Sequence, residues 1–182
     1  MKRFLRCFQY CLIAAVLVSL CRAADAGSIS FVGDFSNIHS TTEHSYGYSV
    51  QLWRQGDKLF GLFSSASGLS GDTPTGQLED VRYDPATGKL SFTSRLSVAA
   101  VYMGKGKQEP THDVFSFNGS LQNNIITGVL THEEKHQTKP RPIVTRVRLT
   151  KSKTSESPLP SSTYDEWRES ADQILRVRGP KW

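Results

Sequence analysis

Cysteine is scarce in this chain and confined to its N-terminal end. The 182 residues include three cysteines, Cys7, Cys11 and Cys21, all of them within the first 21 positions. The rest of the sequence therefore offers neither a disulfide framework nor a thiolate metal site. From Gly27 onward the chain has to be held together by a hydrophobic core, and its length suits one domain of ordinary size.

A concentrated positive charge and a long hydrophobic run are also missing. The 22 Lys and Arg residues exceed the 17 Asp and Glu residues, but four of the basic residues lie within positions 1–26. Nucleic-acid-binding domains usually present a dense basic face, so nucleic acid is not a predicted partner. No apolar run approaches the roughly 20 residues of a membrane-spanning helix, so no transmembrane segment is predicted.

The N-terminus has the three-part layout of a secretory signal peptide. Lys2, Arg3 and Arg6 form a positive start, residues 11–20 form a short apolar run, and residues 24–26 read Ala-Asp-Ala. Small residues at the first and third of those last positions are what signal peptidase requires. We predict that residues 1–26 are a signal peptide cleaved after Ala26, and that the protein is periplasmic or secreted.

Residues 27–151 repeat one unit, a stretch of alternating apolar and polar residues followed by a turn. This alternation places one set of side chains on each face of a sheet. Short turns rich in Gly, Asn and Pro make successive strands antiparallel neighbours, and closing them into a barrel removes exposed edges. We predict an all-β fold, an eight-stranded antiparallel up-and-down barrel, with strands at 29–35, 46–53, 58–64, 77–83, 89–103, 112–121, 125–132 and 143–150.

The C-terminal part changes its periodicity. After a Ser/Pro-rich linker at 152–162, the pattern Thr163-x-x-Glu166 is typical of a capping box at a helix start. Apolar residues then follow at helical spacing, which predicts one amphipathic helix over 163–178, docked on the outside of the barrel. Trp53 has the opposite parity to the apolar residues before it, so we expect it to face outward beneath this helix.

The longer links of the meander, at 36–45, 65–75, 104–110 and 133–141, all fall at one end of the predicted barrel. Binding groups often lie on loops held by a rigid scaffold, and barrel mouths are frequent ligand sites. The histidines gather there beside several glutamates, and imidazoles in such surroundings can bind a divalent metal. They are also ordinary residues of polar loops. The candidate metal ligands are His39, His44, His112, His132 and His136.

One segment matches a catalytic motif. His132-Glu133-Glu134-Lys135-His136 reads H-E-x-x-H, the signature of zinc metalloproteases. That chemistry needs a helix, so that both imidazoles share one face, whereas this segment follows a predicted strand and soon reaches Pro140. We interpret the match as coincidental, and we predict no catalytic residue and no cofactor.

The predicted architecture resembles the calycin group of lipocalin-like and avidin-like barrels. Gly33-x-Phe35 in the first strand is similar to the lipocalin Gly-x-Trp motif, with Phe in place of Trp. By this resemblance Arg146 or Arg148 of the last strand would cover that aromatic ring. The Thr-Asp-Tyr signature of lipocalins is replaced by Gln122-Asn123-Asn124. The resemblance implies that a small, largely apolar ligand is carried in the barrel lumen.

The leading functional hypothesis is an exported, non-enzymatic binding protein with a small apolar ligand in the barrel or at its mouth. The candidate ligand-binding residues are Tyr46, Tyr48, Phe92, Tyr102, Phe115 and Phe117. A barrel of eight strands is only just wide enough for its own side chains. The alternative is therefore a filled barrel that binds another envelope protein, for example as an enzyme inhibitor. A metal-dependent enzyme using the His/Glu loops is the third hypothesis, and the sequence leaves the oligomeric state open.

Overall fold

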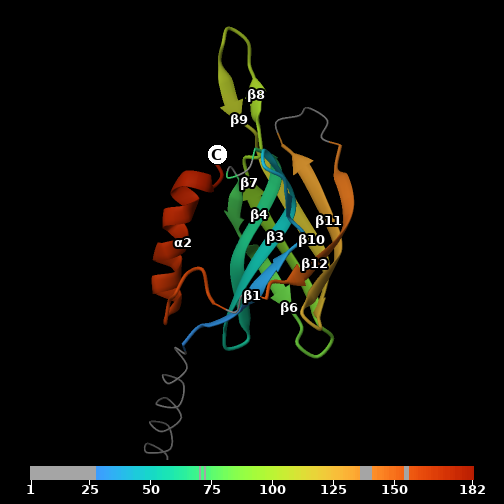
Figure 1. The fold of residues 1–182 in the computed structure, drawn as a ribbon, viewed down its shortest axis with the longest axis vertical. Coiled ribbons are helices and arrows are strands. Elements are labelled where there is room, and N and C mark those ends of the chain that lie inside the picture. Colours follow the sequence, from blue (N-terminus) through green and yellow to red (C-terminus); the bar gives the residue numbers. More distant parts are fainter. Residues whose placement is uncertain (1–27, 70, 72, 136–140, 154–155) are drawn as a thin grey trace, which may run out of the picture.

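The computed structural model describes residues 28–69, 71, 73–135, 141–153 and 156–182. It shows an antiparallel β-barrel with one helix against its outer surface and a two-stranded hairpin projecting from one end (Figure 1). The predicted signal peptide, residues 1–26, lies outside the described residues.

The strands are β1 (Ser30–Ser36), β2 (His39–Ser40), β3 (His44–Gln55), β4 (Lys58–Leu69), β5 (Thr75–Gln77), β6 (Glu79–Tyr83), β7 (Lys89–Leu96), β8 (Ala100–Tyr102), β9 (Gln108–Pro110), β10 (Asp113–Gln122), β11 (Ile125–Glu134) and β12 (Ile143–Lys151). The helix is α2 (Tyr164–Arg178). The main sheet has the order β5-β4-β3-β1-β12-β11-β10-β7-β6, β2 pairs with β3, and β8 and β9 pair only with each other.

The strand order confirms the predicted meander. Every pairing in the main sheet is antiparallel, and the first and last strands meet through Phe35 opposite Lys151 and Ser36 opposite Thr150. The structure is thus a nearly closed antiparallel barrel, because β5 and β6, the two ends of the sheet path, are separated by Leu78 alone.

The number of strands differs from the prediction of eight, since nine strands lie along the sheet path. The predicted strand 77–83 is divided at Leu78: β5 pairs with β4, and β6 pairs with β7. A positive φ of 51° at Asp80 accompanies an irregular register between β6 and β7, which bends the chain from one neighbour to the other. The predicted strand 89–103 ends at Leu96, and Ala100–Tyr102 joins the separate hairpin instead.

Two hydrophobic clusters follow from the alternation. The first fills the barrel with inward-facing side chains from most of its strands, among them Phe35, Leu52 and Ile126, which are completely buried. The second lies outside the barrel, where α2 covers Trp53 and Phe60. The rings of Trp53 and Trp167 are 5.5 Å apart and both are buried, which confirms the expected place of Trp53 beneath the helix.

The capping box predicted for the helix is present. Thr163 is the N-cap, its hydroxyl accepts a hydrogen bond from the Glu166 N–H, and the Glu166 carboxylate accepts one from the Thr163 N–H. The short links also have the expected chemistry, because Asn123 and Asn124 adopt φ of 51° and 60° in the turn between β10 and β11. Among the described residues, no helix has the length and hydropathy needed to cross a membrane.

The arginine expected to cover Phe35 does not do so. Arg146 and Arg148 alternate along β12 with the buried Val147 and Leu149, so they face solvent on the other side of the sheet from Phe35. Strand parity excludes both arginines from the interior. The side chain of Lys151 lies over Gly33 instead, where a Cβ atom would be only 2.6 Å from the Lys151 Cε.

Candidate functional site

Four of the six aromatic residues expected to bind a ligand lie in the barrel interior: Tyr48, Phe92, Phe115 and Phe117. The rings of Phe92 and Phe117 are 5.0 Å apart, and Phe63 packs between the others at 5.1 Å from Phe115 and 6.1 Å from Phe92. Tyr48 stacks on Phe63 at 5.9 Å. These rings contact one another, so they occupy the interior themselves.

The other two aromatic residues are exposed at the end of the barrel that carries the long links, here called the loop-rich end. Tyr46 near the start of β3 is 54% exposed and Tyr102 in the β8–β9 hairpin is 65% exposed. The alternating pattern that groups them with Tyr48 and Phe92 does not show where the barrel wall ends. The structure therefore divides the predicted set into an interior group and a surface group.

The four described histidines lie at the loop-rich end. His39 is on β2, His44 begins β3, His112 precedes β10, and His132 is on β11. His136 lies outside the described residues. Within the described part of the chain, no three His, Cys, Asp or Glu side chains form a group that could hold a metal ion.

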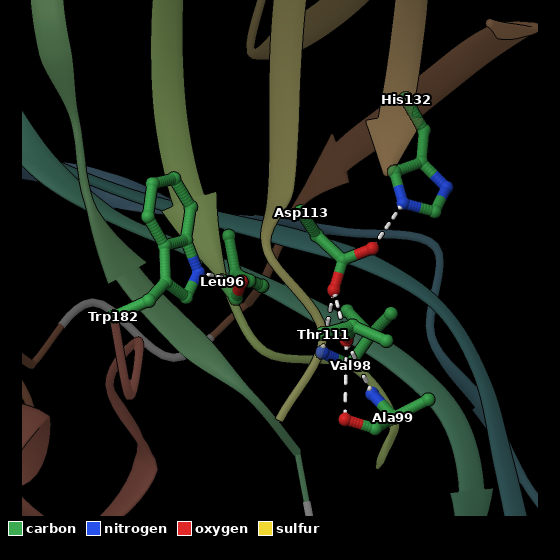
Figure 2. Close-up of polar contacts among 7 residues, drawn as sticks. All are labelled: Leu96, Val98, Ala99, Thr111, Asp113, His132 and Trp182. Atoms are coloured by element: carbon green, nitrogen blue, oxygen red, sulfur yellow. Dashed lines mark hydrogen bonds and ion pairs between the residues drawn. The ribbon is translucent and has the colours of Figure 1, made fainter. Parts of the chain in front are cut away.

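A buried carboxylate connects two of these segments. Asp113, the first residue of β10, is completely buried, and its Oδ1 is 2.6 Å from the Nε2 of His132 (Figure 2). Its Oδ2 accepts hydrogen bonds from the Val98 N–H, at 2.9 Å, and from the Thr111 hydroxyl. A buried carboxylate is tolerated only when its oxygens are satisfied in this way.

The same network fixes the base of the β8–β9 hairpin. The Thr111 hydroxyl accepts a hydrogen bond from the Ala99 N–H at 3.0 Å, and the Thr111 N–H donates to the Ala99 carbonyl at 2.9 Å. Asp113 therefore joins the segment that enters the hairpin, the segment that leaves it, and His132 on β11. The hairpin therefore projects from a base that is hydrogen-bonded on both of its sides.

The ionisation of Asp113 is set by competing effects. Burial by itself raises the pKa of the carboxyl, but the hydrogen bonds from His132, Thr111 and the Val98 N–H outweigh it, so the pKa is lowered overall. Because an ionised carboxylate can only accept hydrogen bonds, the His132 Nε2 carries the hydrogen and donates a hydrogen bond to Asp113. The His132 ring stacks on Phe115 at 4.3 Å, and its other nitrogen points away from Asp113 (Figure 2).

The C-terminal residues reach the same corner of the molecule. The Trp182 Nε1–H donates to the Leu96 carbonyl at 2.9 Å, and its ring stacks on His112 at 4.7 Å. The Lys181 N–H donates to the Ser97 hydroxyl at 3.1 Å. Residues that follow α2 are thus held against the segment that enters the β8–β9 hairpin.

Asp113 and Thr111 are not among the site residues predicted from the sequence, although the strand pattern contains a signal for Asp113. Asp113 has the same strand parity as Phe115 and Phe117, which predicts an inward-facing acid. An acid at an inward position needs nearby donors, and His132 on the next strand was already a candidate. Trp182 gave no comparable signal, because it belongs to neither the strand pattern nor the helix pattern.

The loop-rich end also gathers exposed apolar side chains. Tyr102 and Met103 project from the hairpin, with exposed fractions of 65% and 55%. Leu69 at the end of β4 is 68% exposed and Ile143 at the start of β12 is 61% exposed. Together with Tyr46, these five residues are called the loop-end surface below.

A groove lies between the base of the hairpin and the end of β4. It has a volume of about 360 Å³, and its lining is mixed, with Ser67 and Ser97 beside the apolar Leu69, Pro74 and Val98. It opens at the mouth of the barrel rather than into the interior.

Comparisons of the chain with protein-family models, with curated proteins and with solved structures find no match. The structure itself shows the architecture, which is a nearly closed antiparallel β-barrel with one C-terminal helix.

Proposed function

We propose that this protein is an exported, non-enzymatic binding module, which binds another protein through the loop-end surface. The observation that carries this proposal is the division of the aromatic residues, with the interior filled by packed rings while Tyr102 and Met103 stand exposed on the projecting hairpin. An internal ligand would have to displace that core. The exposed apolar side chains, in contrast, are available without any rearrangement.

The composition of the loop-end surface suits a protein interface. Tyrosine and methionine are enriched at interface centres, and large apolar side chains exposed on a projecting element are available to a partner. Lys105 lies in the turn at the hairpin tip and Lys107 closes that turn, and polar residues of this kind commonly border apolar interface centres.

The Asp113 network supports the same function by holding the hairpin in place. Three segments are fixed to one buried carboxylate, so the hairpin loses less conformational freedom when it binds. Pre-ordering of this kind strengthens binding by reducing its entropic cost. A projecting and anchored hairpin is a geometry suited to insertion into a partner's cleft.

The test compares two variants for capture of partners from the periplasm or culture medium of the source cells. Tyr102→Ser/Met103→Ser removes the apolar tip, and Val177→Ser removes a side chain on α2 that is 75% exposed. We expect the tip variant to lower the affinity for the captured partner, measured with both proteins purified, by at least about tenfold. The Val177 variant should bind as the unchanged protein does, and equal binding by the tip variant would contradict the proposal.

A calycin-like carrier is the second candidate function, and the groove at the barrel mouth favours it. The meander order and the helix after the last strand are arranged as the resemblance to lipocalins implies. A ligand of about 360 Å³ or less would lie in the groove beside Leu69 and Val98. Ala100→Trp should fill the groove and abolish the fluorescence enhancement of an apolar dye, whereas an unchanged dye titration would exclude a ligand there.

A further inference from the structure

The outer surface of β6, β7, β10, β11 and β12 carries a regular polar pattern. Cross-strand pairing places one row of outward side chains side by side, and an adjacent row lies two residues along each strand. The first row is Arg82, Ser91, Asn118, Val129 and Arg146, and the second is Lys89, Ser120, Thr127 and Arg148. Each row has a basic residue at both ends and mostly hydroxyl or amide side chains between them.

Three arginines of this surface, here called the arginine face, carry uncompensated charge. Arg82, Arg146 and Arg148 are exposed and form no ion pair within the described part of the chain. The glutamates nearest the face are already engaged, Glu79 by Arg95 at 2.7 Å and Glu133 by Lys135. Asp80 lies at the β6 border, and Lys89 has Asp84 as an electrostatic neighbour. The positive charge therefore lies at the two ends of the rows, and the side chains between these ends are uncharged.

The arginine face is open to solvent and hollowed. The helix α2 packs on the outer surface of β3 and β4, on the other side of the barrel from β11 and β12 (Figure 1). Two shallow depressions, of about 280 and 500 Å³, lie on the face and share Arg82, Ser91 and Asn118 in their walls. Asp84 lines the first and Asp80 the second, both on the β6 side. An extended chain could lie in these depressions along a row.

We propose that the arginine face binds a linear anionic polysaccharide, one that carries carboxylate or sulfate groups. Guanidinium groups bind such planar or tetrahedral anions with paired hydrogen bonds. The Ser, Thr and Asn side chains between the arginines offer donors and acceptors suited to sugar hydroxyls. From β6 to β12 the basic ends of a row are four strand spacings apart, roughly 19 Å counted along the curved barrel wall, so a chain has to follow that curve to contact both ends. Arg146 and Arg148, two residues apart on β12, are separated by about 7 Å and can be contacted by neighbouring anionic groups.

Other classes of partner fit the arginine face less well. Single-stranded nucleic acids are bound by aromatic side chains that stack on bases, and the two rows contain none. Protein interfaces and membrane-inserting surfaces need apolar anchors, whereas Val129 is the one apolar residue in the two rows. This inference is independent of the loop-end surface.

The experiment measures retention of the full chain on immobilised heparin and polygalacturonate, with dextran as the neutral control. Arg146→Gln/Arg148→Gln removes two charges from the face, and Arg176→Gln/Arg178→Gln removes two exposed charges from the far side, on α2. The affinity for heparin or polygalacturonate should fall at least about tenfold for the first variant, because charge-assisted contacts are lost. The second variant should keep it, and circular dichroism should show that both remain folded.

Several outcomes would overturn the proposal. They are failure of the unchanged protein to bind either anionic polymer at about 0.1 M salt, equal loss of binding in the two variants, and equally strong binding to duplex DNA. The first would remove the ligand class. The second would reduce the effect to net charge, and the third would assign the face to polyanions in general. Retention of the protein on heparin but not on polygalacturonate would restrict the ligand to sulfated chains.

Discussion

Asp113 illustrates how one residue at a strand end can organise a surface. A carboxylate at an inward position costs free energy unless several donors reach it, and three do so here from three different segments. These hydrogen bonds therefore stabilise the fold and, at the same time, order the base of the hairpin. The residue acts on the proposed binding surface through the Val98 and Thr111 contacts, not by touching a partner.

Replacing Asp113 with Asn should lower the free energy of unfolding by about 2–3 kcal/mol, because charge-assisted hydrogen bonds become weaker neutral ones and one donor is left unpaired. Urea unfolding measures this loss. Asp80→Asn serves as the control, since Asp80 is exposed and asparagine tolerates its positive φ. We expect the control to stay within about 0.5 kcal/mol of the unchanged protein.

The same carboxylate predicts a pH dependence with a definite sign. The pKa of Asp113 in the folded state is below the unfolded value of 3.8, so its contribution is fully present above about pH 4 and is lost as the pH falls through the folded pKa. The difference in unfolding free energy between the unchanged protein and Asp113→Asn should therefore shrink below pH 3.8. A difference that stays constant from pH 6 down to about pH 2 would show that this pKa is not lowered.

At the scale of elements, α2 is held by one apolar stripe. Its capping box fixes where it begins, but its attachment depends on Trp167, which is fully buried against Trp53 and Phe60. A single helix of this length is marginal in water, so packing rather than propensity supplies most of its stability. The helix in turn covers an apolar surface that strand parity would otherwise leave exposed.

Trp167→Ala should reduce the free energy of unfolding by about 3–5 kcal/mol, as expected for removal of a large buried aromatic side chain. Thermal and urea unfolding give the magnitude. Val177→Ala, on the exposed side of the same helix, should change the stability by less than about 0.5 kcal/mol. Similar losses of unfolding free energy in both variants would mean that α2 is stabilised by helix propensity and not by packing against the barrel.

For the whole molecule, the decisive feature is the seam where β5 and β6 complete the barrel. Gly76 on β5 lies so close to β7 that a Cβ atom would be 2.3 Å from the Arg95 carbonyl oxygen. The Leu78 N–H donates to the Gly61 carbonyl at 2.9 Å, and the Ser94 hydroxyl donates to the Gln77 carbonyl at 3.0 Å. Closure depends on this close approach of backbones.

Gly76→Val should force the seam apart and lower the free energy of unfolding by about 2–3 kcal/mol. Gly68→Val on β4 is the matched control, because a Cβ atom there meets nothing within 4 Å. Amide hydrogen exchange should show faster opening of β5–β7 in the Gly76 variant alone. Unchanged protection of those strands would mean that the seam is not a structural weak point.

Much of the architecture could be predicted because it depends on local patterns. Alternation placed Phe35 and Phe117 inside and Trp53 outside, and the Thr163 capping box located the helix start. The division of strand 77–83 could not be predicted, since it depends on which neighbour each half meets. The candidate site could be predicted only in part. The loop-rich end was expected, but the Asp113 network was not, because it joins residues that are distant in sequence.

The sequence by itself determined the class of fold, the order of strands, the turns and the helix, because period, turn residues and capping act over a few neighbouring positions. Only the tertiary structure decided that Tyr48 and Phe115 fill the interior while Tyr102 stands exposed, and that cross-strand pairing joins Arg82 and Arg146 in one row of outward side chains. Those outcomes depend on where the barrel wall ends and on the register between strands. Both are set by packing across the whole molecule.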